Sequence, residues 1–319
     1  MIVWVAFIAL VLFLLAMDLG VLNRKAHVIH PKEALLWTSF WIGLALSFNV
    51  FVYFLYQNQG WGLDLGFAFA LSGKDAALEF LAAYLVEESL SLDNIFVIAI
   101  IIAHFKVPAI YQHRVLFWGI LGALVMRGVM IGLGTALIQQ FEWIAYVFGA
   151  ILLITAVKML LHRDDSVDPE QNWLIRLARS FLPVSNTMSE GKFLVKIGGV
   201  THITPLFLVL LMVETTDLLF AVDSIPAVFA VTRDPFIVFT SNVFAILGLR
   251  SLYFALAGLM DKFALLKFSL VFILAYVGVK MLMANHYHVP IPVTLGIIAG
   301  TLAVGVLASI VNERRKAAE

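Results

Sequence analysis

The sequence predicts an all-α polytopic membrane protein of about nine transmembrane helices, six of which form two inverted three-helix repeats. Three observations lead to this fold class. The chain of 319 residues is 62% hydrophobic and only 13% charged, which is too little polar cover for a soluble domain of this size. Its apolar residues fall in runs long enough to cross a bilayer, and two groups of three runs resemble each other.

Nine apolar runs are long enough to cross a hydrocarbon core of about 30 Å. They lie at residues 1–22, 34–56, 77–103, 115–138, 142–161, 203–230, 236–258, 264–284 and 290–311. The first run lacks a basic leader and a small-residue cleavage motif, so we expect a retained span rather than a signal peptide. The whole chain, 1–319, is expected to be a single transmembrane domain.

Basic residues alternate between the loops. Fifteen Lys and Arg residues lie in one set of loops and the C-terminal tail, whereas the other set contains only Lys74 and Arg233. Because cytoplasmic loops are enriched in Lys and Arg, this bias predicts an outside N-terminus and a cytoplasmic C-terminus. The zero net charge gives no reason to expect a nucleic-acid partner, and the sequence contains no Cys for disulfides or thiolate metal ligands.

The longest polar segment, 163–201, falls on the cytoplasmic side. Its stretch "QNWLIRLARSFL" places apolar side chains on one helical face and Arg176 and Arg179 off that face, which is typical of an interfacial helix. The stretch "KFLVKIGGVTHIT" alternates around Gly198-Gly199 and predicts a small β-hairpin. We interpret the acidic residues between 164 and 170 as a solvated loop rather than a cation site.

The two units of the repeat cover 77–161 and 203–284. "LDNI" at 92–95 matches "VDSI" at 222–225, and similar stretches follow in both units. A unit with an odd number of spans, repeated in tandem, must insert in opposite orientations. Inverted repeats with polar sites near the midplane are a recurring transporter plan.

The register of the repeat has two solutions. Pairing Asp93 with Asp223 keeps the local match, but Arg127 then follows by 34 residues and Arg250 by only 27. Pairing Asp93 with Asp217 gives nearly equal spacings of 34 and 33. We prefer the local match, and we expect a longer loop between the first two spans of the first unit to absorb the difference. The choice stays open at this point.

Spans three and six contain an unusual number of acidic residues. There are six: Glu87, Glu88, Asp93, Glu214, Asp217 and Asp223. An ionised group at the centre of a helix costs about 2.5–3.5 kcal/mol on insertion scales, so six unpaired groups would cost roughly 15–20 kcal/mol. They must therefore be paired, protonated, hydrated or bound to metal. Arg127 and Arg250, in the middle of spans four and seven, offer partial compensation.

An all-oxygen cation site is expected where spans three and six meet. The expected metal ligands are Glu87, Asp93, Asn94, Glu214, Asp217 and Asp223. The expected supporting partners are Ser91, Ser224, Arg127 and Arg250. Carboxylate and amide oxygens suit Mg²⁺, Ca²⁺ or Mn²⁺ better than Zn²⁺ or Cu, and Pro226 frees a further backbone oxygen beside Asp223. Glu87 and Asp93 point about 120° apart on an ideal helix, so they converge only if the helix bends or unwinds. The alternative is a purely structural set of acid–Arg pairs, and Glu88 is the first candidate bystander.

Three further stretches are distinctive: "EESLSLDNIFV", "VETTDLLFAVDSIPAVFAVTRDPFIVFTSN" and "FAILGLRSLYFALAG". They resemble motifs of the TerC family of bacterial integral membrane proteins, most closely its Alx branch, which implies a location in the bacterial inner membrane. The family is grouped with LysE-like exporters and was first associated with tellurite resistance, and Alx-type members are associated with Mn²⁺ export. The resemblance therefore implies a Mn²⁺ exporter. The family's motif positions match Glu87, Asp93, Asn94, Glu214, Asp217, Asp223 and Ser224 in this sequence.

We therefore expect a secondary transporter, not an enzyme, that exports divalent cations and above all Mn²⁺. Its partners would be the metal substrate and the lipid bilayer, it would have no resident cofactor, and assembly into a homo-oligomer stays open. One alternative keeps transport but changes the solute, to Ca²⁺ in exchange for protons or to a cationic amino acid. Another is a membrane scaffold in a stress- or tellurite-resistance complex, for which segment 163–201 should matter more than the intramembrane charges.

Overall fold

The computed structural model describes residues 2–17, 31–59, 71–141, 143–161, 172–185, 191–256, 265–284, 287 and 289–316. These residues form ten α-helices and one two-stranded sheet. The helices before the polar segment are α1 (Ile2–Met17), α2 (Pro31–Gln57), α3 (Gly73–His104), α4 (Ala109–Gln140) and α5 (Ile144–Leu161). The polar segment contains α6 (Trp173–Phe181), β1 (Leu194–Ile197) and β2 (Val200–Ile203). The remaining helices are α7 (Pro205–Phe229), α8 (Pro235–Leu256), α9 (Leu266–Met283) and α10 (Ile291–Lys316).

Seven helices are long and apolar enough to cross a membrane, namely α2, α4, α5, α7, α8, α9 and α10. Each of the nine predicted runs falls on a helix. However, α1 has only 16 residues in the described part of the chain, and α3, with 32 residues, carries many charged side chains. The all-helical architecture is confirmed, with seven candidate membrane spans among the ten helices that the structure describes.

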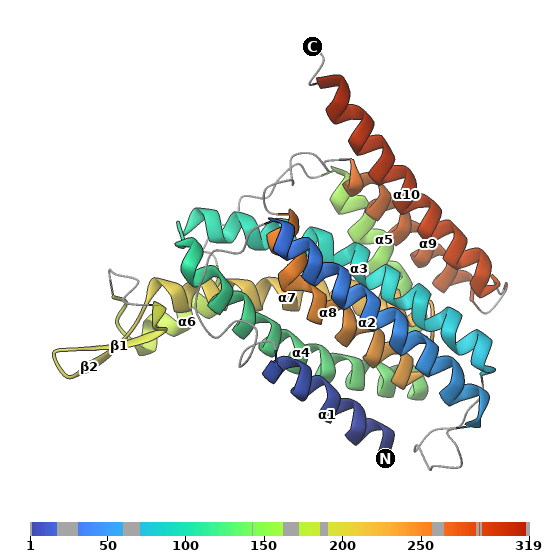
Figure 1. The fold of residues 1–319 in the computed structure, drawn as a ribbon, viewed down its shortest axis with the longest axis horizontal. Coiled ribbons are helices and arrows are strands. Elements are labelled where there is room, and N and C mark those ends of the chain that lie inside the picture. Colours follow the sequence, from blue (N-terminus) through green and yellow to red (C-terminus); the bar gives the residue numbers. More distant parts are fainter. Residues whose placement is uncertain are drawn as a thin grey trace.

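The long helices pack side by side as one bundle around α8 (Figure 1). In the apolar window of α8, 89% of the residues are buried, whereas the corresponding value is 22% for α2 and for α10. The outer helices expose large apolar side chains such as Leu36, Val125 and Val304. An apolar exterior around an interior that contains polar groups is the arrangement that a bilayer requires.

Glycine lets two helices of the bundle approach closely. A Cβ atom added at Gly149 of α5 would lie 3.1 Å from the carbonyl oxygen of Gly278 in α9, and a Cβ added at Gly278 would lie 3.1 Å from the carbonyl oxygen of Gly149. The backbones of α5 and α9 are therefore nearly in contact at this point.

The polar segment forms the expected hairpin and helix. β1 and β2 pair antiparallel, and the two-residue turn between them consists of Gly198 and Gly199, with φ of +58° and +84°. Positive φ at both turn positions matches the right-handed twist of a hairpin, and Gly adopts it without strain. The hairpin and α6 lie together at one end of the bundle (Figure 1). In α6, Ile175 is buried against the protein while Trp173 and Phe181 are exposed, so an interfacial location stays a prediction.

The expected long loop in the first repeat unit is absent, so this prediction was wrong. Four residues, 105–108, connect α3 to α4, and five, 230–234, connect α7 to α8. The extra length lies in the helices instead. α3 continues for eleven residues after Asp93, whereas α7 continues for six after Asp223, and α4 also has more residues before its arginine than α8 has.

Candidate functional site

A buried arginine lies at the centre of the polar interior. From Nε and Nη2, Arg127 of α4 donates hydrogen bonds to the carboxylate of Asp217 in α7, at 3.3 and 3.1 Å. Its Nη1 donates to Ser224 Oγ of α7 at 3.2 Å and to Asn242 Oδ1 of α8 at 2.9 Å. The same Nη1 forms an ion pair with Glu87 of α3. One guanidinium therefore connects four helices.

A second contact links α3 directly to α7, because Asn94 Nδ2 donates to Asp217 Oδ1 at 2.8 Å. We refer to the connected residues as the Arg127 cluster: Glu87, Asn94, Arg127, Asp217, Ser224 and Asn242. No member is more than 3% exposed. With both acids ionised, the cluster has one more negative charge than positive. Since a charge buried without a partner is strongly unfavourable, these contacts are what makes the group tolerable in a membrane interior.

Helical spacing explains how the sequence builds this cluster. Glu87 and Asn94 are seven residues apart on α3, and Asp217 and Ser224 are seven apart on α7. Side chains seven apart lie on the same face of a helix after two turns. Ser91, four residues after Glu87, is also buried on this face of α3. Each helix therefore presents one polar stripe.

Some polar atoms in the cluster lack partners. Among the described residues, Glu87 Oε2, Asn94 Oδ1 and Asn242 Nδ2 are buried and make no hydrogen bond. Buried polar atoms in proteins are nearly always satisfied, so such exceptions require a reason. Two of the three are oxygens, which is the atom type that a hard cation takes as ligand.

Two of the predicted ligands lie elsewhere. α3 is a continuous helix from 73 to 104, so Asp93 and Glu87 lie on different faces of it. The charged residue that interacts with Asp93 is Lys267 of α9. Asp223 accepts a hydrogen bond of 2.7 Å from Thr155 of α5. Asp93 and Asp223 are both partly exposed. The six expected ligands are therefore divided among several positions rather than gathered in one.

The other two carboxylates have separate surroundings. The carboxylate of Glu214 lies directly over Gly122 of α4, where there is no room for a Cβ atom. Glu214 and Asp217 thus both face α4, as their spacing of three residues predicts. Glu88 accepts a hydrogen bond of 3.0 Å from the hydroxyl of Tyr84, one turn earlier in α3.

The two arginines of the repeat have different partners. Arg250 of α8 is buried, but its Nη1 donates to His113 Nε2 at 3.0 Å instead of joining the Arg127 cluster. Asn242, in contrast, belongs to the cluster and was missed by the sequence analysis. The signal was available, because "TSN" at 240–242 interrupts an otherwise apolar span.

A cation at this site would be held by mixed oxygen ligands. The part of the chain that the structure describes contains no group of three or more His, Cys, Asp or Glu residues arranged to hold a metal ion. Glu87 and Asp217 could supply carboxylate oxygens, and Asn94 and Ser224 could add an amide and a hydroxyl oxygen. The guanidinium of Arg127 occupies the space between the two carboxylates.

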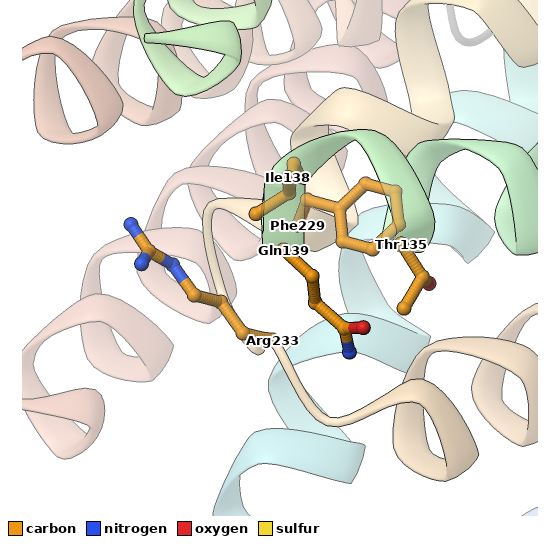
Figure 2. A pocket seen from close by; sticks show the side chains of 5 residues that line it. All are labelled: Thr135, Ile138, Gln139, Phe229 and Arg233. Atoms are coloured by element: carbon orange, nitrogen blue, oxygen red, sulfur yellow. The ribbon is translucent and has the colours of Figure 1, made fainter. Parts of the chain in front are cut away.

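A pocket lies near the C-terminal ends of α4 and α7, and no residue of the Arg127 cluster lines it. It is lined by Thr135, Ile138, Gln139, Phe229 and Arg233. Figure 2 shows the Arg233 side chain extending away from the Phe229 ring, with Thr135 beside that ring. The ring packs against Gly134, where an added Cβ would lie 2.7 Å from it. Phe229 therefore forms one wall of the pocket and packs closely against α4.

The sequence profile of the integral membrane protein TerC family matches residues 72–317. The chain belongs to the TerC family. Relatives cover nearly its whole length. It is 47% identical over 311 residues to the uncharacterized membrane protein STKORF319 of Myxococcus xanthus, which covers 98% of this chain and 92% of the relative. It is 45% identical over 311 residues to Alx of Escherichia coli K12, covering 97% of this chain and 93% of Alx.

The name of the Escherichia coli relative describes Alx as a proposed membrane-bound redox modulator. A more distant relative, an uncharacterized membrane protein of Rickettsia bellii, is 37% identical over 310 residues and covers 97% of both chains. No solved structure matches the chain. Together with the seven candidate spans, membership of the TerC family makes this an integral multi-pass membrane protein.

Proposed function

We propose that this TerC-family protein is a secondary transporter that exports divalent cations from the cytoplasm, with Mn²⁺ as its main substrate. The observation that carries the proposal is the Arg127 cluster. Two carboxylates, Glu87 and Asp217, come from different helices and share a single arginine inside a membrane protein. Ionisable groups at such depth are costly, and they mark ion pathways in membrane proteins.

The ligand types support a hard cation as substrate. The cluster offers carboxylate, amide and hydroxyl oxygens and contains no His, and the sequence contains no Cys. Mg²⁺, Ca²⁺ and Mn²⁺ prefer oxygen ligands, whereas Zn²⁺ and Cu bind better to nitrogen and sulfur. The choice of Mn²⁺ within this group rests on the resemblance to the Alx branch.

The proposal includes nine membrane spans, which adds α1 and α3 to the seven apolar helices. α3 packs against α2, α7 and α8, and its carboxylates Glu79 and Glu87 are buried in protein. Phe7 of α1 packs against Phe48 of α2 and Phe236 of α8, which supports a place for α1 in the bundle. The excess of basic residues in alternate loops supports an outside N-terminus, a cytoplasmic C-terminus and an inner-membrane location.

Helix packing supports the inverted repeat of α3–α5 and α7–α9. α3 packs against α8 as α7 packs against α4, and α5 packs against α9. Where α3 meets α7, Asn94 contacts Asp217, while Glu87 and Ser224 share the Nη1 atom of Arg127. Matching Glu87 with Asp217 and Asn94 with Ser224 makes these two contacts equivalent, which favours the register that pairs Asp93 with Asp223. Alternating access would then come from rocking one unit against the other.

The remaining carboxylates have secondary roles in the proposal. Glu214 lies next to Asp217 on the side that faces α4, so we assign it as a proton carrier. Asp93 and Asp223 lie outside the cluster on α3 and α7, where they would bind the cation before or after the cluster does. This division replaces a single site of six ligands with a main site and flanking positions.

The name of Alx suggests a second function, redox modulation. The present sequence contains no Cys, so this chain cannot exchange thiols and disulfides. A redox role of this protein would therefore depend on the metal ion that it transports. Both functions then depend on the same carboxylates, and transport is the one to test first.

Flux measurements in proteoliposomes test the proposal. Mn²⁺, Ca²⁺, Mg²⁺ and lysine are offered under imposed pH gradients to the unmodified protein and to the Asp217→Asn and Glu88→Gln variants. We expect Mn²⁺ flux in the unmodified protein, a decrease of about tenfold or more in Asp217→Asn, since loss of even an outer contact to a metal costs 10–100-fold, and little change in Glu88→Gln. Thermal unfolding of each variant confirms that it is folded.

The outcomes distinguish the alternatives. Flux of lysine without metal flux would make the protein a cationic amino-acid exporter. Equal Mn²⁺ flux in Asp217→Asn and the unmodified protein would overturn the assignment of the site. No flux of any solute, combined with loss of metal tolerance in cells only when segment 163–201 is deleted, would favour the scaffold.

A further inference from the structure

The guanidinium of Arg127 has two chemically different sets of partners. Its Nε and Nη2 atoms bind the charged oxygens of Asp217. Its Nη1 atom forms the ion pair with Glu87 and also binds two neutral oxygens, from Ser224 at 3.2 Å and Asn242 at 2.9 Å. The neutral pair can hold one end of the guanidinium whether or not Asp217 is bound to it.

The two carboxylates do not provide enough negative charge for a divalent cation and the guanidinium to lie between them at the same time. Glu87 and Asp217 together provide two negative charges, which one divalent cation balances. A divalent cation beside the guanidinium would leave a net positive charge in a water-poor interior, where like charges repel strongly. In the described chain, Glu87 Oε2, on the carboxylate that pairs with the guanidinium, and Asn94 Oδ1 also have no hydrogen-bond partner.

We propose that Arg127 competes with the transported cation for the carboxylates of Glu87 and Asp217. This inference extends the proposed function and rests on it. In the described conformation the guanidinium occupies the carboxylates of Glu87 and Asp217. When a divalent cation binds, the guanidinium of Arg127 releases both carboxylates and leaves the space between them, while its Nη1 atom stays hydrogen-bonded to Ser224 and Asn242. When the cation leaves, the guanidinium returns. The two carboxylates therefore have a positive partner at every stage, and monovalent ions have no vacant site to pass through.

Competition predicts that removing the arginine tightens binding of the substrate. Mn²⁺ binding is measured by calorimetry on the purified, detergent-solubilised full chain and on the variants Arg127→Gln and Arg250→Gln. Arg250 is the matched control, because it is also a buried arginine but is hydrogen-bonded to His113. We expect Arg127→Gln to bind Mn²⁺ at least fivefold more tightly, the lower end of typical coupling between two ligands, and Arg250→Gln to bind within about twofold of the unmodified protein.

A charge-balanced pair of variants covers the case in which Arg127→Gln does not fold. Glu87→Gln/Arg127→Gln removes one charge of each sign, and it should bind Mn²⁺ more tightly than Glu87→Gln alone. Equal or weaker binding after loss of Arg127, or equal tightening in Arg250→Gln, would overturn the competition. Mn²⁺ binding that is absent, or that is unchanged by Asp217→Asn, would instead overturn the proposed function itself.

Discussion

Asp217 connects α7 to two neighbouring helices through a single carboxylate. It accepts hydrogen bonds from Asn94 and from two nitrogens of Arg127, so contacts to α3 and α4 converge on one carboxylate of α7. Asp223, only six residues later, faces α5 through Thr155. Six residues turn an α-helix by about 600°, which leaves the two side chains about 120° apart. Two acids that lie close together in the sequence of one helix therefore need not belong to one site.

This separation predicts different phenotypes for acids that the sequence groups together. Asp217→Asn should abolish tight Mn²⁺ binding to the purified protein. Asp93→Asn and Asp223→Asn should leave binding at the Arg127 cluster within about threefold and slow the flux instead, because neither contacts the cluster. Calorimetry and proteoliposome flux on the same preparations provide the comparison. Loss of binding in all three variants would restore the single site.

At the scale of helices, the close contact of α5 with α9 joins the two proposed repeat units. Gly149 and Gly278 bring the two backbones together, and Leu282 also lies 3.0 Å from the position of a Cβ at Gly149. In membranes, where apolar side chains gain little from leaving lipid, such close approach is a main source of helix association. Small residues at this crossing therefore determine how closely the units fit.

Enlarging either glycine should push α5 and α9 apart. Gly149→Ala and Gly278→Ala are each expected to lower the free energy of unfolding by about 1–3 kcal/mol, the usual cost of overpacking. Gly43→Ala is the control, because an added Cβ there meets no atom within 4 Å and alanine favours the helix by roughly 0.5–1 kcal/mol. Thermal unfolding in detergent measures the difference. Equal stability of all three variants would show that the crossing tolerates a wider spacing.

For the whole molecule, the proposed topology predicts which surface sites face outward. The sequence contains no Cys, so each introduced cysteine is the single thiol of the chain. Lys74→Cys and Arg233→Cys should react with a membrane-impermeant maleimide in intact cells, whereas Lys196→Cys should react only after permeabilisation. All three positions are exposed in the structure. If α3 did not cross the membrane, positions 74 and 196 would lie on the same side of it, and both would react under the same condition.

Much of this architecture could be predicted from the sequence, because lipid imposes length and polarity on each span. The positions of the helices and of the hairpin at Gly198-Gly199 follow from local patterns. So does the seven-residue spacing that places Glu87 and Asn94 on one face. What the sequence could not give is the rotation of each helix against its neighbours, which depends on side-chain packing across the whole bundle. The partnership of Arg127 with Asn242, 115 residues away, is of this kind.

The position of Glu87 and Arg127 on consecutive helices has a consequence for biogenesis. Forty residues separate them, and Asp217 follows only ninety residues later. α3 alone would carry its acidic side chains into the bilayer without compensation, but an α3–α4 hairpin can form the Glu87–Arg127 pair as soon as α4 has been synthesised. The insertion machinery should therefore release these two helices into lipid as a pair. The other partners that Arg127 has on α7, Asp217 and Ser224, join the pair only after α7 has been synthesised.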